Sequence, residues 1–249
     1  MPAHAVIDPP KTAAPAGVLS VVIPAYNEGP TIERILDKVV AVRINVGIEL
    51  IVVDDGSKDN TREVVTNWIA RHDGLDRFTF RVVTKENGGK GTAVRRGIAE
   101  STGDWVIIQD ADLEYDPNDY PALLAPLLAG EAKVVYGSRI LGPDKPGSMK
   151  FYLGGRLVTL VTNLLYWANL TDEPTCYKVF DGKLIRGIDL TCTGFEFCPE
   201  VTAKVIKRGH RILEVPIRYY PRGIEEGKKI RSWDGVLALW ELLKWRFRK

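Results

Sequence analysis

The chain has 249 residues, 45% of them hydrophobic and 27% charged, and its formal net charge is +2. These values are typical of a globular protein with one large α/β domain, and a charge so near neutrality gives no indication of a nucleic-acid partner. The three cysteines, Cys176, Cys192 and Cys198, lack metal-ligand spacing, and their odd number argues against a disulfide framework. We therefore expect reduced thiols and a cytoplasmic protein.

The first half of the chain alternates predicted strands with predicted helices. Residues 1–17 carry four prolines and five alanines without the apolar run of a signal peptide, so we expect a disordered leader there. Helices are expected to begin near Pro30, after Asn60 in a capping box with Glu63, and after Gly91. A further helix is expected at Tyr120–Leu128, and strands at Leu19–Ile23, Ile48–Val53, Phe78–Thr84, Trp105–Gln109 and Lys133–Tyr136. This alternation predicts a mainly parallel, Rossmann-like sheet covered by helices on both faces.

The second half is less regular, but no linker divides it from the first. Helices are predicted at Phe151–Leu170, Phe197–Arg208 and Trp233–Phe247, and a strand at Arg211–Tyr220. No apolar stretch reaches the about 20 residues that span a bilayer, so we expect no transmembrane segment. We expect residues 18–249 to form a single domain.

Acidic side chains follow two of the predicted strands. Asp110-Ala111-Asp112 comes after Trp105–Gln109, and Asp54-Asp55 ends the strand at Ile48–Val53. Two carboxylates one residue apart can share a divalent cation that keeps open positions for a diphosphate, although Asp-X-Asp also occurs in solvated turns. The polar loop after Ile23 and the glycine-rich basic loop Asn87–Gly91 belong to the same edge, because ligands of open α/β sheets bind outside the carboxyl ends of the strands.

Two other kinds of nucleotide site do not fit. A dinucleotide-binding site requires G-x-G-x-x-G after the first strand, whereas this strand runs into Pro24-Ala25-Tyr26-Asn27-Glu28. A P-loop requires G-x-x-x-x-G-K-[ST], and here the position of the first glycine, five residues before Gly89, is not a glycine, and Thr92 is displaced. A nucleotide held by acids and a metal ion is the remaining interpretation.

The ordered motifs resemble those of the family 2 glycosyltransferases with the GT-A fold. They are PAYNE from Pro24, VVDDGS from Val52, NGGKGTAVRRG from Asn87 and DADLEYDP from Asp110, followed by GSR at Gly137, TCYK at Thr175, GFEF at Gly194 and EGKKI at Glu226. The resemblance runs from about Leu19 to Trp233 and is greatest to dolichyl-phosphate mannosyltransferases and related polyprenyl-phosphate glycosyltransferases. It implies a nucleotide-sugar-binding half at 18–140, an acceptor half with a closing loop at 141–232 and an amphipathic C-terminal helix at 233–249. The GT-A sheet would thus carry a C-terminal extension on the acceptor side.

The resemblance implies how the donor is bound. Asp110 and Asp112, with Glu114 as a third oxygen ligand, would bind Mg²⁺ or Mn²⁺, and the ion would neutralise the charge that grows on the leaving nucleoside diphosphate, a catalytic role for Asp112. Lys90 and the flanking glycine amides would face the phosphates. The remaining donor-binding residues would be Pro24, Tyr26 and Glu28 as a wall for the base and ribose, Asp54 and Asp55 as acceptors for the base or the ribose hydroxyls, and Arg222, Lys228 and Lys229 in the closing loop.

The acceptor is less well defined. The resemblance implies that Arg139 and Arg156 hold a lipid phosphate, which suits the planar fork of arginine. A phosphate is already ionised and needs no general base, whereas a sugar hydroxyl would need one, for which Asp172 and Glu173 are candidates. Asp172 could equally bind hydroxyls of the donor sugar. The aromatic and basic C-terminal helix either lies at a membrane interface or packs on the core.

We therefore expect a metal-dependent, inverting hexosyltransferase. Its donor would be a nucleoside-diphosphate sugar of the GDP-mannose or UDP-glucose type. Its acceptor would be a polyprenyl or dolichyl phosphate met by a peripheral enzyme on the cytoplasmic membrane face. The alternatives are transfer to a sugar or protein hydroxyl, a nucleotidyltransferase and a non-catalytic nucleotide-binding module. A nucleotidyltransferase would carry a basic glycine-rich loop directly after the first strand, and the sequence has none at that position.

Overall fold

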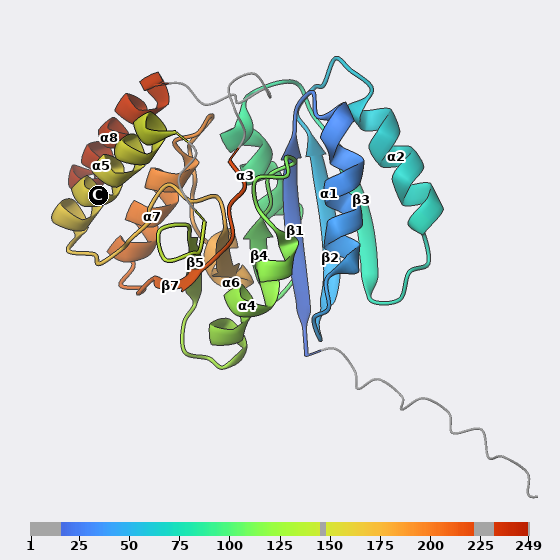
Figure 1. Ribbon diagram of the computed structural model, residues 1–249, viewed down its shortest axis with the longest axis horizontal. Coiled ribbons are helices and arrows are strands. Elements are labelled where there is room, and N and C mark those ends of the chain that lie inside the picture. Colours follow the sequence, from blue (N-terminus) through green and yellow to red (C-terminus); the bar gives the residue numbers. More distant parts are fainter. Residues whose placement is uncertain (1–15, 145–147, 222–231, 249) are drawn as a thin grey trace, which may run out of the picture.

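The computed structural model describes residues 16–144, 148–221 and 232–248, and these build one sheet covered by helices (Figure 1). Its strands lie in the order β3-β2-β1-β4-β6-β5-β7. Every neighbouring pair is parallel except those of β6, which runs antiparallel to β4 and β5. The strands are β1 (Val18–Ala25), β2 (Gly47–Asp54), β3 (Phe78–Thr84), β4 (Trp105–Ile108), β5 (Val134–Ser138), β6 (Lys178–Asp181) and β7 (Leu213–Pro216). The predicted α/β class, the mainly parallel sheet and the GT-A arrangement are confirmed.

Both faces of the sheet are covered, because apolar side chains of each strand alternate between two cores. Leu19, Val21 and Ile23 of β1 belong to the core under α1, α2 and α4, whereas Val22 belongs to the core under α3, α6 and α7. The covering helices are α1 (Gly29–Ala41), α2 (Thr61–His72), α3 (Lys90–Glu100), the 3₁₀ turn η1 (Pro117–Asp119), α4 (Tyr120–Leu128), α6 (Gly182–Arg186) and α7 (Phe197–Lys207).

Two long helices form an additional outer layer on α7. They are α5 (Met149–Tyr166) and α8 (Ser232–Phe247), which lie side by side at the end of the molecule away from β3 (Figure 1). Val158 and Tyr166 of α5 pack with Ala203 of α7 and with Leu242 and Trp245 of α8. Within the described residues, neither these helices nor any other has the length and apolar character needed to cross a membrane.

A buried carboxylate joins β1, β2 and the turn before β4. Glu49 accepts hydrogen bonds from the Ser20 hydroxyl at 2.5 Å and from the amide and hydroxyl of Thr102 at 2.8 and 3.0 Å. Burial alone would raise the pKa of Glu49, but these hydrogen bonds outweigh it and hold the pKa below its ordinary value. The ionised form of Glu49 is therefore part of the folded structure.

The sequence misplaced several element boundaries. β6 was not predicted, and the strand expected at Arg211–Tyr220 is only Leu213–Pro216. The helix expected at Phe151–Leu170 begins at Met149 and ends at Tyr166, because Trp167 takes a left-handed conformation with φ 50°. The capping box was wrong, since the Asn60 side chain makes no capping hydrogen bond and Asp59 binds Thr61 instead.

Candidate active site

One cavity of about 810 Å³ collects most of the predicted site residues. Asp54 does not line it, although Asp55 does, and Arg222, Lys228 and Lys229 lie outside the described residues. The predicted residues that line the cavity are Pro24, Tyr26, Glu28, Asp55, Lys90, Asp110, Asp112, Glu114, Arg139, Arg156 and Asp172.

The sheet topology explains this convergence. Parallel strands β1, β2, β4 and β5 end at one edge, so the loops after them meet there. Because β6 is antiparallel, its beginning lies at that same edge, and the segment that precedes Lys178 enters the cavity. Donor-side acids after β4 and Asp172 before β6 thus face one space.

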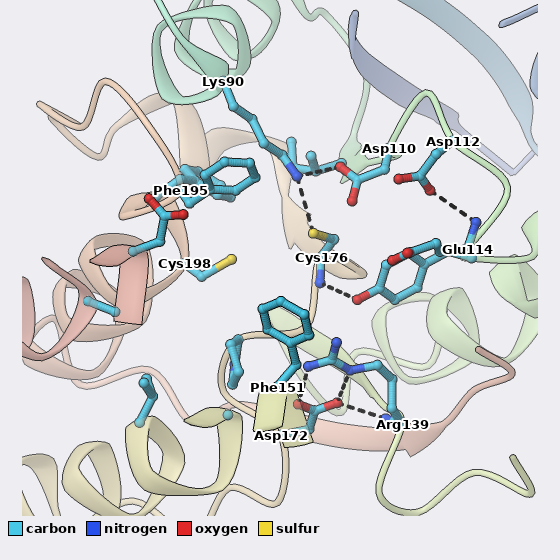
Figure 2. Close-up of a pocket in the computed structure, with 18 of the residues that line it drawn as sticks. Lys90, Asp110, Asp112, Glu114, Arg139, Phe151, Asp172, Cys176, Phe195 and Cys198 are labelled. Carbon is cyan, nitrogen blue, oxygen red and sulfur yellow. Dashed lines mark hydrogen bonds and ion pairs between the residues drawn. The ribbon is translucent and has the colours of Figure 1, made fainter. Parts of the chain in front are cut away.

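The acid pair lies at one end of the cavity. Figure 2 shows the carboxylates of Asp110 and Asp112 next to each other. Asp112 Oδ1 accepts a hydrogen bond from the Glu114 amide at 3.0 Å, while Glu114 Oε2 accepts one from the Tyr219 hydroxyl at 2.7 Å. Within 16–144, 148–221 and 232–248, no three His, Cys, Asp or Glu side chains stand close enough to form a metal site by themselves. The described structure thus brings Asp110 and Asp112 together, but not Glu114 with them.

This pair still fits a hard divalent cation. Mg²⁺ is commonly held by one or two carboxylates and completes its coordination with water and substrate phosphates. Asp110 and Asp112 offer only oxygen ligands and line a cavity large enough for a nucleotide. The two carboxylates are therefore suitable ligands for a metal ion that binds together with a diphosphate.

Lys90 extends from the first turn of α3 to the acid pair. Its ammonium group lies 2.5 Å from Asp110 Oδ1 and 3.3 Å from Cys176 Sγ, and the Phe195 ring covers it at 5.4 Å (Figure 2). Burial alone would lower the pKa of Lys90, but the charge of Asp110 outweighs it and raises the pKa above its ordinary value. Lys90 is a fixed cation in the cavity.

The glycine-rich loop before α3 is held by Asp55. The amides of Gly88 and Gly89 donate to this carboxylate at 3.0 and 2.8 Å, and Lys85 forms an ion pair with it. Gly89 has φ 92°, and a Cβ there would lie 2.5 Å from the Thr193 carbonyl oxygen, so only glycine fits. These two amides therefore position the loop rather than point at a ligand, contrary to the expectation that they face phosphates.

Arg139 and Asp172 form a bidentate pair at the opposite end of the cavity. Arg139 Nε and Nη2 both donate to the Asp172 carboxylate at 2.8 Å, and the Arg139 amide donates at 2.9 Å (Figure 2). The guanidinium also lies 5.1 Å from the Tyr219 ring centroid. Burial would raise the pKa of Asp172, but Arg139 outweighs it and holds the pKa below its ordinary value. Asp172 is therefore an ionised, weakly basic carboxylate.

Arg156 and Glu173 line the same region but differ in character. Arg156 is exposed and donates to the Thr171 carbonyl at 3.0 Å. Glu173 is buried, accepts from Thr202 at 2.9 Å through Oε1, and has no hydrogen-bond partner for Oε2 among the described residues. Burial raises the pKa of Glu173 above its ordinary value, the opposite direction from Asp172.

Several cavity residues were not singled out as site residues from the sequence, and four of them stand out. They are Phe151, Cys176, Cys198 and Tyr219. Tyr219 connects the two ends, because its hydroxyl binds Glu114 while its ring contacts Arg139. The sequence gave a signal for two of the four. Cys176 lies within the TCYK segment, and Cys198 directly follows GFEF.

Comparisons with known proteins found one matching family and several similar sequences. The family described as "Glycosyl transferase family 2" matches residues 20–186. The low-salt glycan biosynthesis hexosyltransferase Agl6 of Haloferax volcanii is 32% identical over 83% of this chain and 49% of its own length. The dolichol-phosphate mannosyltransferase of Pyrococcus furiosus is 26% identical over 91% and 64%, and the dolichyl-phosphate beta-glucosyltransferase ALG5C of Trichomonas vaginalis is 29% identical over 80% and 62%. The chain thus spans about half to just under two thirds of the length of these relatives.

The fold is shared with a solved structure as well. Glucosyl-3-phosphoglycerate synthase from Mycobacterium tuberculosis, crystallised with Mn²⁺, UDP and glucosyl-3-phosphoglycerate, superposes with a TM-score of 0.69. It is 22% identical, and the match covers 92% of this chain and 80% of that chain. Similarity at this level supports a common fold.

Proposed function

The chain belongs to glycosyltransferase family 2, and on that premise we propose that it moves a hexose from a nucleoside-diphosphate sugar to a polyprenyl phosphate, with inversion and with a divalent metal ion. The observation that carries the proposal is the layout of one cavity. An acid pair with a lysine lies at one end, and an arginine lies at the other, next to α5 (Figure 2). The diphosphate of a sugar donor at the first end and the monophosphate of an acceptor at the second end can approach each other inside the cavity.

The donor end supplies oxygen ligands and positive charge. Asp110 and Asp112 would hold Mg²⁺ or Mn²⁺, whose chemistry is to neutralise charge on the departing diphosphate. Lys90 adds a fixed positive charge beside them. Pro24, Tyr26 and Glu28 line the cavity after β1, where a base and ribose would lie, and Arg222, Lys228 and Lys229 remain proposed phosphate ligands of a closing loop.

The acceptor end favours a phosphate over a hydroxyl. Arg139 Nε and Nη2 bind Asp172, and its Nη1 makes no hydrogen bond with any residue of the described ranges. We assign this nitrogen and Arg156 to the acceptor phosphate. Because its ion pair lowers the pKa of Asp172, this residue would remove a proton from a hydroxyl poorly, whereas an ionised phosphate needs no such step.

An exposed apolar surface begins beside the cavity. We call it the α5–α8 apolar face, and each of its side chains is at least 36% exposed. Phe151 of α5 and Ala238 of α8 line the cavity between these helices, so the face continues from the site. It consists of Met149, Leu153, Leu157, Leu160, Leu164 and Trp167, with Trp233, Val236, Leu237, Trp240, Leu243 and Phe247.

Such a face suits an acceptor that is anchored in a bilayer. Large exposed apolar side chains on two neighbouring helices are typical of a membrane or protein contact, and basic residues such as Arg156 and Arg246 on the same helices suit anionic lipid head groups. We propose peripheral binding to a membrane through the α5–α8 apolar face. The names of two relatives, a dolichol-phosphate mannosyltransferase and a dolichyl-phosphate beta-glucosyltransferase, support a polyprenyl-phosphate acceptor.

The experiment is a donor panel with and without acceptor. The chain is incubated with GDP-mannose, UDP-glucose and related donors, with Mn²⁺ and with polyprenyl phosphate in detergent, and the lipid is analysed by mass spectrometry. We expect one donor to yield a hexosyl lipid phosphate, EDTA to abolish the product and Mn²⁺ to restore it. Transfer only to free sugars or peptides, with polyprenyl phosphate inert, would establish the hydroxyl-acceptor alternative.

A further inference from the structure

Two of the three cysteines share the cavity. Cys176 precedes β6 and Cys198 lies in the first turn of α7, and both are partly exposed and line the cavity wall. Cys192 is only 3% exposed and does not line the cavity. The chain therefore offers a pair of accessible thiols and a buried thiol that serves as an internal reference.

The two accessible cysteines lie next to each other. Cys198 Sγ contacts the carbonyl oxygen of Thr175 at 3.5 Å, and Thr175 is bonded directly to Cys176. In Figure 2 both sulfur atoms project into the same gap from opposite sides. The two cysteines therefore come from segments that are in direct contact beside the cavity.

Positive groups surround this pair. Lys90 Nζ lies 3.3 Å from Cys176 Sγ, and Cys198 stands at the amino-terminal end of α7, where the helix dipole favours a thiolate. The neighbouring Cys198 thiol, followed by burial, raises the pKa of Cys176, and the neighbouring Cys176 thiol lowers the pKa of Cys198. Burial and the neighbouring Glu200 raise the pKa of Cys192.

We propose that Cys176 and Cys198 are an oxidative modification site, which a peroxide converts into an intramolecular disulfide inside the cavity. The Cys198 thiolate attacks one peroxide oxygen, forming a sulfenic acid and releasing the other oxygen as water after protonation. The Cys176 sulfur then attacks the Cys198 sulfur and releases a second water. The two thiols are oxidised to one disulfide, and one hydrogen peroxide is reduced to two waters.

The position of this disulfide gives it an effect on ligands. Cys176 lies between the Lys90–Asp110 end and the Arg139–Asp172 end of the cavity (Figure 2). The disulfide would withdraw Cys176 from Lys90 and cross the space between the two ends. The inference goes beyond the proposed function, because the thiol chemistry requires neither donor nor acceptor.

The test counts thiols in the full chain. After treatment with hydrogen peroxide and removal of the excess, thiols are titrated under denaturing conditions without reductant. We expect the count to fall from three to one, and dithiothreitol to restore it. Cleavage after Lys178 and after Glu196 places the three cysteines in three different peptides, so peptide mapping by mass spectrometry identifies the bonded pair.

Three variants make the assignment specific. Cys192→Ser should fall from two thiols to none, whereas Cys176→Ser and Cys198→Ala should form no intramolecular disulfide and oxidise to sulfinic acid at the remaining accessible cysteine. A chain that keeps three thiols, or a disulfide that includes Cys192 or joins two chains, would overturn the proposal. No sugar donor enters this assay, so a negative result would not count against the proposed glycosyl transfer. Likewise, a failure to detect glycosyl transfer would not count against the disulfide.

Discussion

Lys90 Nζ lies 2.5 Å from Asp110 Oδ1, so one of the two acids assigned to the metal already carries a cation. Both side chains are largely withdrawn from solvent, with 20% and 13% of their surface exposed. A divalent ion at Asp110 must therefore displace Lys90 or share the carboxylate with it. Lysine released in this way would be free to meet the diphosphate that arrives with the ion.

The variant Lys90→Met should consequently separate metal binding from donor binding. Without the competing charge, Mn²⁺ alone should bind about tenfold more tightly, since one charge-assisted hydrogen bond is worth about 1.5–3 kcal/mol. The nucleoside diphosphate should bind more weakly. Titration of Mn²⁺ followed by electron paramagnetic resonance measures the first effect and calorimetry the second. Lys85→Met is the control, because Lys85 pairs with Asp55. Unchanged Mn²⁺ affinity in Lys90→Met would rule out competition.

Asp112→Asn should lower metal-dependent transfer at least about a hundredfold, because it removes one of the two carboxylates proposed to hold the ion. Its melting temperature should stay within a few degrees of the parent, since Asp112 is partly exposed at the cavity rim. Initial rates over a Mn²⁺ series, with thermal unfolding alongside, measure both. Asp73→Asn, an exposed acid after α2, is the matched control. Near-normal turnover in Asp112→Asn would remove Asp112 from the metal site.

Arg139→Ala and Asp172→Asn separate the two classes of acceptor. If Arg139 binds the acceptor phosphate, Arg139→Ala should reduce kcat/KM for polyprenyl phosphate about ten- to a hundredfold and spare donor affinity. Asp172→Asn should cause a smaller loss, by loosening Arg139, and should leave the acidic limb of the pH profile as it is in the parent, because Asp172 is not the base. Rates against acceptor concentration at several pH values measure both variants. If neither variant changes the rate, neither residue takes part in the reaction. If Asp172→Asn is inactive while Arg139→Ala keeps its activity, a hydroxyl acceptor is favoured.

The α5–α8 apolar face should bind lipid vesicles. Replacing one exposed tryptophan, Trp240→Ser, should weaken binding to vesicles with anionic head groups by about tenfold, because a large apolar side chain contributes about 1.5–3 kcal/mol on burial. Flotation with increasing lipid measures the affinity. Leu128→Ser changes a 48% exposed leucine on α4, away from this face, and should leave binding unchanged. Equal flotation of all three proteins would exclude the face as a membrane contact.

Glu49→Gln should destabilise the protein in a pH-dependent way. The pKa of Glu49 is lower in the folded chain than in the unfolded chain, so its contribution is present above the ordinary value of 4.5 and is lost as the pH falls through the folded pKa. We expect a cost of about 1–3 kcal/mol in unfolding free energy at pH 7 and a smaller difference from the parent below pH 4. Urea denaturation at both pH values measures it. A difference that is independent of pH would mean that the charge of Glu49 contributes nothing.

The sequence predicted β1, β2, β4 and β5 well because these strands are largely buried on both faces and read as apolar runs. β6 escaped because it has only four residues and begins with Lys178, a charge that is wholly buried in the fold. Its ammonium group is satisfied by the Glu173 carbonyl at 2.6 Å and by the Tyr136 ring at 3.7 Å. No local pattern predicts such partners, since they come from other segments.

The site was predictable in its residue types and less so in its pairings. Asp54 and Asp55 look equivalent in sequence, but neighbouring residues at a strand end point in opposite directions, and only Asp55 reaches the cavity. The pairing of Arg139 with Asp172 and the turn of Glu114 toward Tyr219 depend on how distant loops meet. Motif spacing specifies which loops meet, but it does not specify which hydrogen bonds form among them.

The reversed direction of β6 has a consequence for the diversification of such proteins. The acids after β4 and the segment before β6 belong to neighbouring strands but are separated in sequence by about 60 residues, from Asp112 to Asp172. Insertions or substitutions in one segment leave the backbone register of the other unchanged. A lineage could therefore change the proposed acceptor site by mutating residues 170–177, while the residues proposed to bind the nucleotide stay the same.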